Sequence, residues 1–231
     1  MTDAALPLDA AHDVIDRALR AGADAAEAVL ARRSALSVSV RLGELEEVER
    51  EESRDLGLRV FIGKKQAVVS ASDLSEPTRA RLVERAVAMA RLAPEDPYAG
   101  LAPQDRLAGR QRPDLDLYDP TDLDAAALEA RARDAEAAAR AVPGVTNSDG
   151  GQASLTTGEW ALVTSHGFEG QHRGSAFSTA AGVIAEKDGI MEIGGEGRST
   201  RHLSDLAGPE AIGAEAGRRA VEDLAPLALA I

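Results

Sequence analysis

The sequence contains no cysteine among its 231 residues. This absence excludes disulfide bonds, thiolate nucleophiles and cysteine-ligated metal sites from the chain. The sequence also lacks a run of about 18 apolar residues, which a membrane-spanning helix requires. Its first residues do not have the basic and apolar segments of a signal peptide. We therefore expect a cytoplasmic protein that has no membrane partner.

Aromatic side chains and positive charge are also scarce. Aromatics make up 3% of the residues, against 44% for all hydrophobic types, so the cores must consist of Ala, Leu, Val and Ile. Lysine and arginine number 26 against 39 aspartates and glutamates, which gives a formal net charge of −13. An acidic surface repels a phosphate backbone, so we expect no nucleic acid partner.

Residues 1–92 are expected to form an N-terminal α+β unit, in the order helix, antiparallel sheet, helix. Periodicity predicts helices at Leu8–Ala23 and from about residue 76 to Leu92. Alternation of apolar and polar residues predicts strands at Ser37–Leu42, Gly57–Ile62 and Gln66–Ala71. The very acidic segment 44–55 is typical of a solvated edge strand, because charge along an edge discourages aggregation.

Residues 93–120 contain five prolines and predict an extended connector. Residues 121–231 are expected to form a helix at Leu123–Val142, a second, mostly antiparallel sheet from Val145 onward, and a terminal helix from Gly208 to about Leu224. The fold class is therefore α+β.

The Gly/Ser/Ala-rich strand Gly174–Ala185 is the strongest indication of a binding surface in the sequence. If its edge is exposed, an extended peptide can add to it through main-chain hydrogen bonds, whatever the peptide sequence. His172 and Arg173 precede this strand, and together with Arg198 they are our candidates for binding a peptide or a partner. The alternative is that these side chains are ordinary solvent-exposed turn residues.

The histidines do not form a zinc peptidase motif. Such a motif needs two histidines one helical turn apart and a glutamate beside them, and none of the four histidines has this pattern. A weaker alternative is a metal enzyme that uses His166 and His172 with Glu169 as a third ligand. We assign no catalytic residue, no metal ligand and no cofactor to this chain.

Three further motifs have plain structural interpretations. Gly194–Ser199 lacks the lysine and the following helix of a phosphate-binding loop, so a bulge or a close backbone approach is expected there. Ser165 and His166 are adjacent in a strand and point to opposite faces, which excludes a serine–histidine pair. Trp160, the only tryptophan, is expected to pack in a core.

Several separate segments resemble one known family, the TldD/PmbA family of metallopeptidases, also called modulators of DNA gyrase. The segments are GLRVFIGKKQAVVSASDLS (Gly57–Ser75), RAVAMARLAPEDPYAGLAP (Arg85–Pro103), LYDP (Leu117–Pro120), NSDGGQASLTTGEWALVTSHGF (Asn147–Phe168) and STRHLSDL (Ser199–Leu206). The sequences of these segments are more similar to the PmbA branch, also called TldE, than to the TldD branch.

The resemblance implies a function. In this family the zinc site lies in the C-terminal half of the TldD branch, and the PmbA branch is its partner subunit. The chain is therefore expected to be the N-terminal part of a non-catalytic subunit that associates with a zinc-bearing TldD-type subunit and with unfolded peptide. The C-terminal family domain is absent, and the apolar segment Pro226–Ile231 falls where the chain is expected to continue. The alternative is an adaptor or modulator, related to gyrase or to a toxin, without a role in peptide cleavage.

Overall fold

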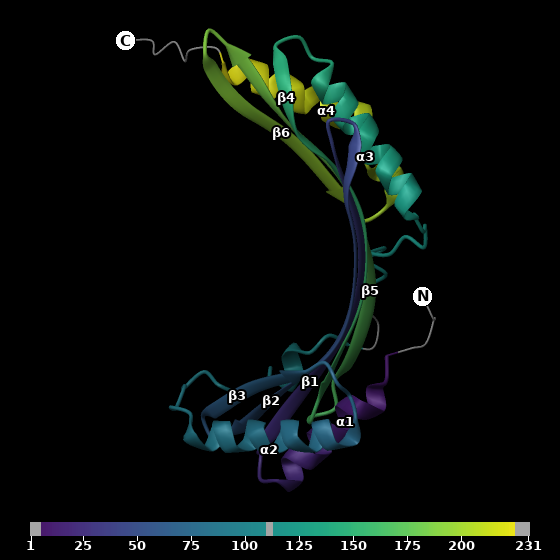
Figure 1. Ribbon diagram of the computed structural model, residues 1–231. Helices are drawn as coiled ribbons and strands as arrows, with labels where there is room; N and C mark the ends of the chain where they lie inside the picture. Colours follow the sequence, from purple (N-terminus) through teal and green to yellow (C-terminus); the bar gives the residue numbers. More distant parts are fainter. Residues whose placement is uncertain (1–5, 110–112, 225–231) are drawn as a thin grey trace. The chain divides into compact units, whose positions relative to one another are not determined.

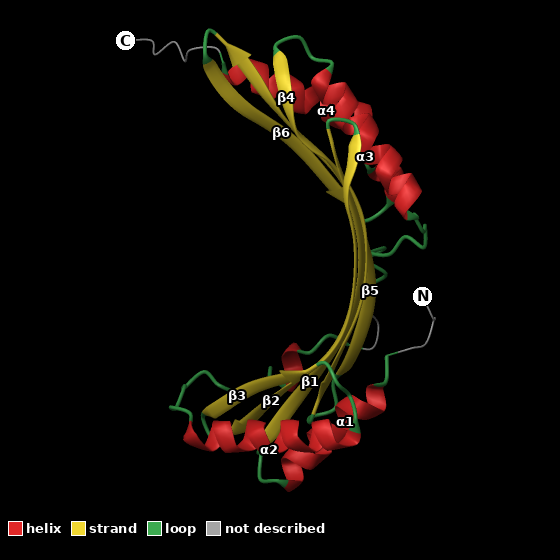
Figure 2. Cartoon of the chain, viewed as in Figure 1, coloured by secondary structure: helices red, strands yellow, loops and turns green. Residues whose placement is uncertain are grey.

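The computed structural model describes residues 6–109 and 113–224 (Figure 1). The described residues form helices and long strands, and the strands make up one sheet (Figure 2). The helices are α1 (Leu8–Arg20), α2 (Glu76–Leu92), α3 (Ala125–Arg140) and α4 (Pro209–Asp223), with short 3-10 helices at Gln104–Arg106 and Leu203–Asp205. The strands are β1 (Ala25–Arg41), β2 (Glu44–Ile62), β3 (Lys65–Ala71), β4 (Val145–Thr164), β5 (Glu169–Lys187) and β6 (Ile190–Thr200).

The strands form one sheet, in the order β3-β2-β1-β4-β5-β6. The α+β class is confirmed, although the strands are hydrogen-bonded in a single order and not as the two sheets that the sequence suggested. None of the described helices is long and apolar enough to cross a bilayer. The segment Pro226–Ile231 lies outside the described residues.

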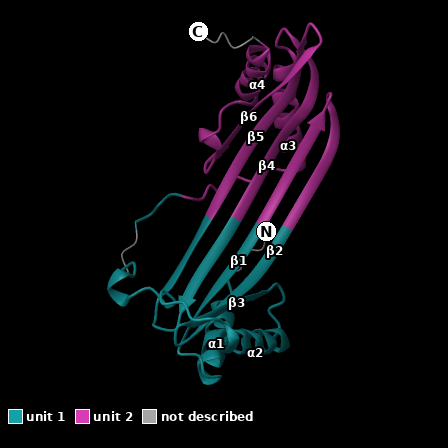
Figure 3. Cartoon of the chain, turned by 90° about the vertical axis from the view of Figure 1, so that its left-hand side faces the viewer, with its two compact units in different colours: residues 1–33, 52–116, 158–173 teal, residues 34–51, 117–157, 174–231 magenta. Residues whose placement is uncertain are grey.

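The described chain divides into two compact units (Figure 3). Unit 1 consists of residues 1–33, 52–116 and 158–173, and unit 2 consists of residues 34–51, 117–157 and 174–231. Strands β1, β2, β4 and β5 each contribute residues to both units. The division of the chain at residues 92 and 120 stays a prediction.

The core of unit 1 is built from small and branched aliphatic side chains. Helices α1 and α2 contact each other, and α2 packs on β3. The apolar stripe of α1, with Val14 and Ile15 buried, joins Leu58, Val60 and Val163 from the strands in one cluster. This composition matches the scarcity of aromatic residues.

Unit 2 places α3 and α4 on one face of its part of the sheet. Ala135 and Ala139 of α3 and Ala216 and Ala220 of α4 form one buried cluster with alternate residues of β5. Those β5 residues are Ala181, Val183 and Ala185. Because successive side chains of a strand point to opposite faces, Ala180, Gly182 and Ile184 face away from the helices.

The expected sheet edge at β5 is not present, whereas the expected edge at residues 44–55 of β2 is. β5 lies between β4 and β6, and Phe177–Lys187 pairs with β6 in an antiparallel register. The expected free edge along Gly174–Ala185 was therefore wrong, because β6 occupies it from Phe177 onward. The acidic segment 44–55 does lie on an edge, since the pairing of β2 with β3 begins only at Leu56.

The LYDP segment acts as a hydrogen-bonding junction in unit 2. The carbonyl of Leu117 accepts a hydrogen bond from the Ser175 amide at 3.0 Å. The carboxylate of Asp119 accepts hydrogen bonds from the amides of Thr121 and Leu203, each at 2.8 Å. The hydrogen bonds from Thr121, followed by that from Leu203, hold the pKa of Asp119 below its ordinary value. One short motif thus joins the connector, β5 and the segment that follows β6.

Replacing Asp119 with alanine is expected to lower the thermal unfolding midpoint at pH 7 by several degrees, because two amides lose their acceptor. The folded-state pKa of Asp119 is depressed, so its contribution is present above the unfolded pKa and is lost as pH falls through the folded pKa. Calorimetry at successively lower pH should therefore show that the difference in unfolding midpoint between wild type and Asp119→Ala becomes smaller as pH falls through the folded-state pKa. Asp122→Ala, which removes an exposed neighbouring carboxylate, is the matched control. Equal midpoints for Asp119→Ala and wild type at pH 7 would contradict the junction role.

Candidate functional site

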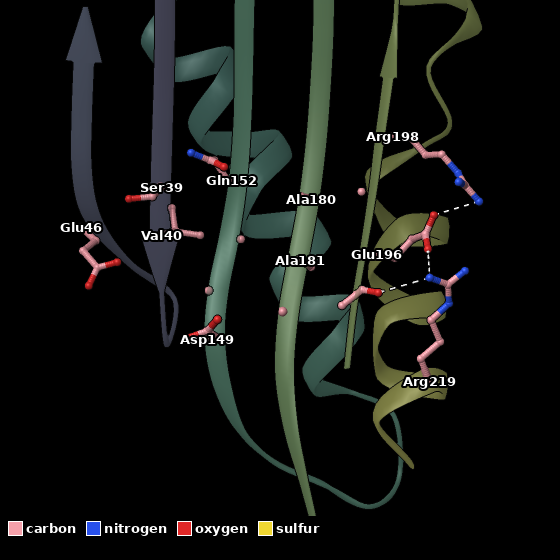
Figure 4. A pocket seen from close by; sticks show the side chains of 15 residues that line it. Ser39, Val40, Glu46, Asp149, Gln152, Ala180, Ala181, Glu196, Arg198 and Arg219 are labelled. Atoms are coloured by element: carbon pink, nitrogen blue, oxygen red, sulfur yellow. Dashed lines mark hydrogen bonds and ion pairs between the residues drawn. The ribbon is translucent and has the colours of Figure 1, made fainter. Parts of the chain in front are cut away.

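The candidate site is an open hollow of about 640 Å³ in unit 2 (Figure 4). This volume lies within the range of small-molecule and peptide side-chain sites, roughly 300–1,000 Å³. Its lining comes from β1, β2, β4, β5, β6 and α4. The lining residues are Ser39, Val40, Glu46, Asp149, Gly150, Gly151, Gln152, Ala180, Ala181, Gly182, Gly195, Glu196, Gly197, Arg198 and Arg219.

Short residues line the middle of the hollow because two strands bring small side chains into register there. Gly182 pairs with Gly195, and Ala180 pairs with Gly197. These residues alternate with those that pack against the helices, so they belong to the opposite face. Close packing of α4 on the other face requires glycine at position 194, because a Cβ there would lie 2.2 Å from the Ala220 nitrogen. The strands therefore lie against α4 on one side, where Glu196 pairs with Ala181 and meets Arg219 of α4, and they carry Ala180, Gly182, Gly195 and Gly197 on the other side.

The acidic side of the hollow is formed by Glu46 and Asp149, both exposed (Figure 4). Asp149 lies over Gly182, where an added Cβ would be 3.3 Å from the Asp149 Cβ. Gly150 follows with a φ of +113°, and a Cβ there would be 2.7 Å from the Val40 carbonyl oxygen. Only glycine fits this conformation and this close approach, so the backbone itself fixes the direction of Asp149.

The basic side of the hollow centres on Glu196, whose side chain is only 4% exposed. Its Oε1 lies 2.8 Å from Arg198 Nη2, and its Oε2 lies 2.6 Å from Arg219 Nη1 (Figure 4). The contact with Arg198 is an ion pair without good hydrogen-bond geometry. The two guanidinium groups are about half exposed. The buried carboxylate thus positions two cationic groups that remain available to solvent.

Arg219 is held from a second direction by its own helix. Its Nε donates a hydrogen bond to Glu215 Oε1 at 2.9 Å. The hydrogen bonds from Arg218 and then from Arg219 lower the pKa of Glu215 to about 2. Glu215 therefore stays ionised through the physiological range and keeps Arg219 directed toward the hollow.

His172 and Arg173 lie in unit 1, not at this hollow. The His172 ring stacks on Trp160 at a centroid distance of 5.0 Å. Both residues line a smaller hollow of about 240 Å³, together with Leu6, Glu159, Trp160 and Gln171. Because Arg198 belongs to unit 2, the three candidates for peptide or partner binding fall in different units, and their role stays a prediction.

Trp160 corrects one expectation. It is 38% exposed, whereas its neighbours Ala161 and Val163 are buried in the unit 1 core. The alternation of β4 places the large ring on the outer face, so Trp160 contributes to a surface and not to a core.

The histidines of unit 1 have structural partners. His166 Nδ1 lies 2.7 Å from Thr164 Oγ1, and its Nε2 lies 3.0 Å from the Ala102 carbonyl oxygen. Ser165 Oγ accepts a hydrogen bond from the Ala26 amide at 3.0 Å, so this hydroxyl ties β1 to the end of β4. In residues 6–109 and 113–224, no three His, Asp or Glu side chains come close enough to hold a metal ion.

Sequence reasoning overlooked the ionic groups of unit 2, apart from Arg198. Glu196, Asp149 and Arg219 come from three separate elements, and only the sheet register brings them together. Glu136 was also overlooked, although a signal was present. It follows Leu128 and Ala132 at intervals of four in α3, which places a carboxylate on the buried stripe of the helix.

Comparison with known proteins identifies both parts of the chain. Residues 26–90 match PmbA/TldA metallopeptidase domain 1, and residues 118–224 match the PmbA/TldA metallopeptidase central domain. The chain is 36% identical over 204 residues to Metalloprotease PmbA of Escherichia coli O157:H7, covering 88% of this chain and 45% of that protein. It spans about half the length of the curated relatives that it matches.

Solved structures share the fold. A protein of Bacteroides thetaiotaomicron described as a modulator of DNA gyrase matches with a TM-score of 0.85 at 20% identity, over 93% of this chain and 49% of that chain. TldE from Thermococcus kodakarensis matches with a TM-score of 0.75 at 18% identity, over 92% of this chain and 47% of that chain. With both domain matches and the PmbA relatives in agreement, the chain belongs to the PmbA/TldD metallopeptidase family.

Proposed function

We propose that this chain is a non-catalytic subunit of a cytoplasmic PmbA/TldD-type metallopeptidase complex, and that it holds unfolded polypeptide for a TldD-type partner. The metal implied by the family name has no fitting ligand set in the part of the chain that the structure describes. In this proposal the zinc is bound by the TldD-type partner, where it activates water for peptide hydrolysis. The chain itself contributes binding and no chemical step.

The hollow of unit 2 is the observation that carries the proposal. Its middle is lined by glycine and alanine, which leave room for side chains of any shape. Ser39, Gln152 and Asp149 add hydrogen-bonding groups that do not select a particular side chain. Carboxylates on one side and guanidinium groups on the other can accept both charge types of an unfolded chain (Figure 4).

Filling the hollow should weaken peptide binding. Ala180→Trp adds a large ring on the face that is free of helices, and we expect it to weaken binding of an unstructured, fluorescently labelled peptide about tenfold or more through steric exclusion. Fluorescence anisotropy would measure the affinity. Ala137→Trp, on the exposed side of α3, adds the same ring away from the hollow and should leave the affinity unchanged.

The subunit role is tested with a full-length TldD-type protein. We expect the chain to co-purify with that protein and to increase its hydrolysis of an unfolded peptide, and Ala180→Trp should reduce the increase without preventing association. Absence of both binding and an effect on turnover would contradict the proposal. Co-purification with gyrase or a small toxin, without a peptidase, would instead favour an adaptor.

A further inference from the structure

The two most exposed large apolar side chains of the described residues lie near each other in the chain of unit 1. Tyr98 is 93% exposed and Leu92 is 87% exposed, whereas the other exposed apolar side chains in residues 6–109 and 113–224 do not exceed 67%. Leu92 ends α2, and Tyr98 follows in the connector. Aromatic residues make up only 3% of the sequence, so a ring that is left in water instead of entering a core indicates a role at the surface.

The turn that carries Tyr98 is fixed by main-chain hydrogen bonds. The Ala99 amide donates to the Asp96 carbonyl at 3.0 Å, and the Tyr98 amide donates to Asp96 Oδ1 at 2.9 Å. The Asp96 amide donates to the Lys64 carbonyl at 2.8 Å, which ties the turn to the β2–β3 hairpin. Pro97 restricts its own φ, and Ala99 is buried. Because the backbone is already ordered, binding through this turn loses little conformational entropy.

The side chain of Tyr98 has no structural task of its own. Only its amide takes part in the turn. Within residues 6–109 and 113–224, no hydrogen bond or ring contact involves its hydroxyl or its ring. A ring that does not contribute to the fold, and is held on an ordered turn, is available to a second molecule.

Lysine ammonium groups lie beside this turn. The sequence has only three lysines, and two of them, Lys64 and Lys65, belong to the β2–β3 hairpin. The Lys64 Nζ donates to the Ala99 carbonyl at 3.3 Å, and the Lys65 Nζ donates to the Arg91 carbonyl at 3.3 Å. These long contacts with carbonyl groups leave both positive charges without compensation by a carboxylate.

Two of the carboxylates near the hairpin are already engaged inside unit 1. Asp24 Oδ2 accepts the Gly63 amide at 2.7 Å, and Asp96 accepts the Tyr98 amide. Glu95 is exposed on the turn. In a chain with a net charge of −13, the two lysines make this turn one of the places where an acidic surface can approach.

We propose that Tyr98 and Leu92 dock into an apolar pocket with carboxylates at its rim on the TldD-type subunit. A protruding ring binds by entering a pocket, so the occupant is a macromolecule, and tyrosine is among the residues that dominate interface energies. The acidic chain disfavours a phosphate backbone or an anionic bilayer, which leaves a protein. The inference rests on the proposed function, since it locates the contact with that partner. It uses a surface of unit 1, whereas the peptide hollow belongs to unit 2.

Tyr98→Ser tests the anchor without disturbing the fold. We expect it to weaken association with a full-length TldD-type protein about tenfold or more, because the ring is the main apolar group of the contact. Its thermal unfolding midpoint should equal that of wild type. Tyr98→Phe keeps the ring and should stay within about threefold of wild type. Leu115→Ser, which removes a 66% exposed apolar side chain elsewhere in unit 1, is the matched control. Biolayer interferometry measures all four proteins.

Lys64→Gln tests the charge of the partner pocket. Glutamine keeps a donor for the Ala99 carbonyl but removes the positive charge. We expect the association rate to fall several-fold at about 20 mM salt and to change little at about 500 mM, where exposed charges are screened. Arg85→Gln, which removes an exposed charge of α2 in the same unit, should leave the rate unchanged at both salt concentrations.

The possible outcomes separate this inference from the proposed function. If wild type associates with the TldD-type protein and Tyr98→Ser associates equally well, the inference is wrong and the proposed function stands. If wild type does not associate at all, both are wrong. Equal weakening by Leu115→Ser would show that the effect is not specific to the turn and would overturn the inference. Binding to anionic lipid vesicles that requires Tyr98, without an effect on the protein partner, would assign the turn to a membrane instead.

Discussion

Replacing Glu136 with alanine is expected to lower the free energy of unfolding by about 3 kcal/mol, because it leaves buried donors without an acceptor. Glu136 is 1% exposed. Its carboxylate accepts hydrogen bonds from the amides of Leu42 and Gly43 at 2.6 and 2.8 Å, and from the Ser148 hydroxyl. A single side chain of α3 therefore fixes the turn between β1 and β2 and the start of β4.

The turn depends on this carboxylate because its sequence is unfavourable. Leu42 has a φ of +53°, a conformation that residues other than glycine rarely adopt, and Gly43 follows at +81°. Hairpin turns of this type usually contain Asn-Gly or Asp-Gly. Glu136→Ala should therefore increase hydrogen exchange at the Leu42 and Gly43 amides, which NMR can measure. Glu129→Ala removes a half-exposed carboxylate on the same helix and should cost about 0.5 kcal/mol.

The effect of Glu136 should depend on pH. Burial raises the pKa of this carboxyl, but the hydrogen bonds from Ser148, Gly43 and Leu42 and the charge of Arg140 outweigh burial and hold the pKa below its ordinary value. The stabilisation is therefore complete above the unfolded pKa and is lost as pH falls through the folded pKa. In urea titrations, the stability difference between wild type and Glu136→Gln should shrink in acid. A difference that is constant across the acidic range would contradict this.

Local patterns in the sequence predicted the helices well and the long strands less well. The expected helix at Leu8–Ala23 corresponds to α1, and the one at Leu123–Val142 to α3. β1 begins at Ala25, well before the expected Ser37. Alanine has a low strand propensity, so this segment does not look like a strand in the sequence. Ala26, Ala28 and Leu30 alternate as buried residues, but this burial arises only when neighbouring strands pair with the segment.

The candidate site depends on contacts that a single sequence does not specify. Periodicity places Ala180 and Gly182 on one face of a strand, but it does not reveal which strand pairs with that segment. Because β6 lies next to β5, the expected edge at β5 is not free. The same position of β6 brings Glu196 into contact with Arg219. Register and strand order are tertiary properties, so the fold class could be predicted from sequence while the site could not.

Gly213→Ala is expected to destabilise the protein by about 2–3 kcal/mol, although alanine favours a helix over glycine by about 1 kcal/mol. Helices α3 and α4 approach so closely that a Cβ at position 213 would lie 2.0 Å from the Ala135 carbonyl oxygen. Gly217, one turn later, is equally restricted, with 2.6 Å to the Ala139 carbonyl oxygen. Any side chain at these positions must push the two helices apart and open the alanine core beneath them.

The sign of the stability change in Gly213→Ala shows whether close packing or helix propensity dominates at this position. Urea unfolding should show a lower midpoint for Gly213→Ala and a larger loss for Gly213→Val, of about 4 kcal/mol or more. Ala214→Val, on the exposed side of the same helix, should change stability by about 0.5 kcal/mol or less. A Gly213→Ala protein that is more stable than wild type would mean that α3 and α4 do not pack this closely. Because α4 also carries Arg219, the same variant should weaken peptide binding at the hollow, whereas Ala214→Val should not.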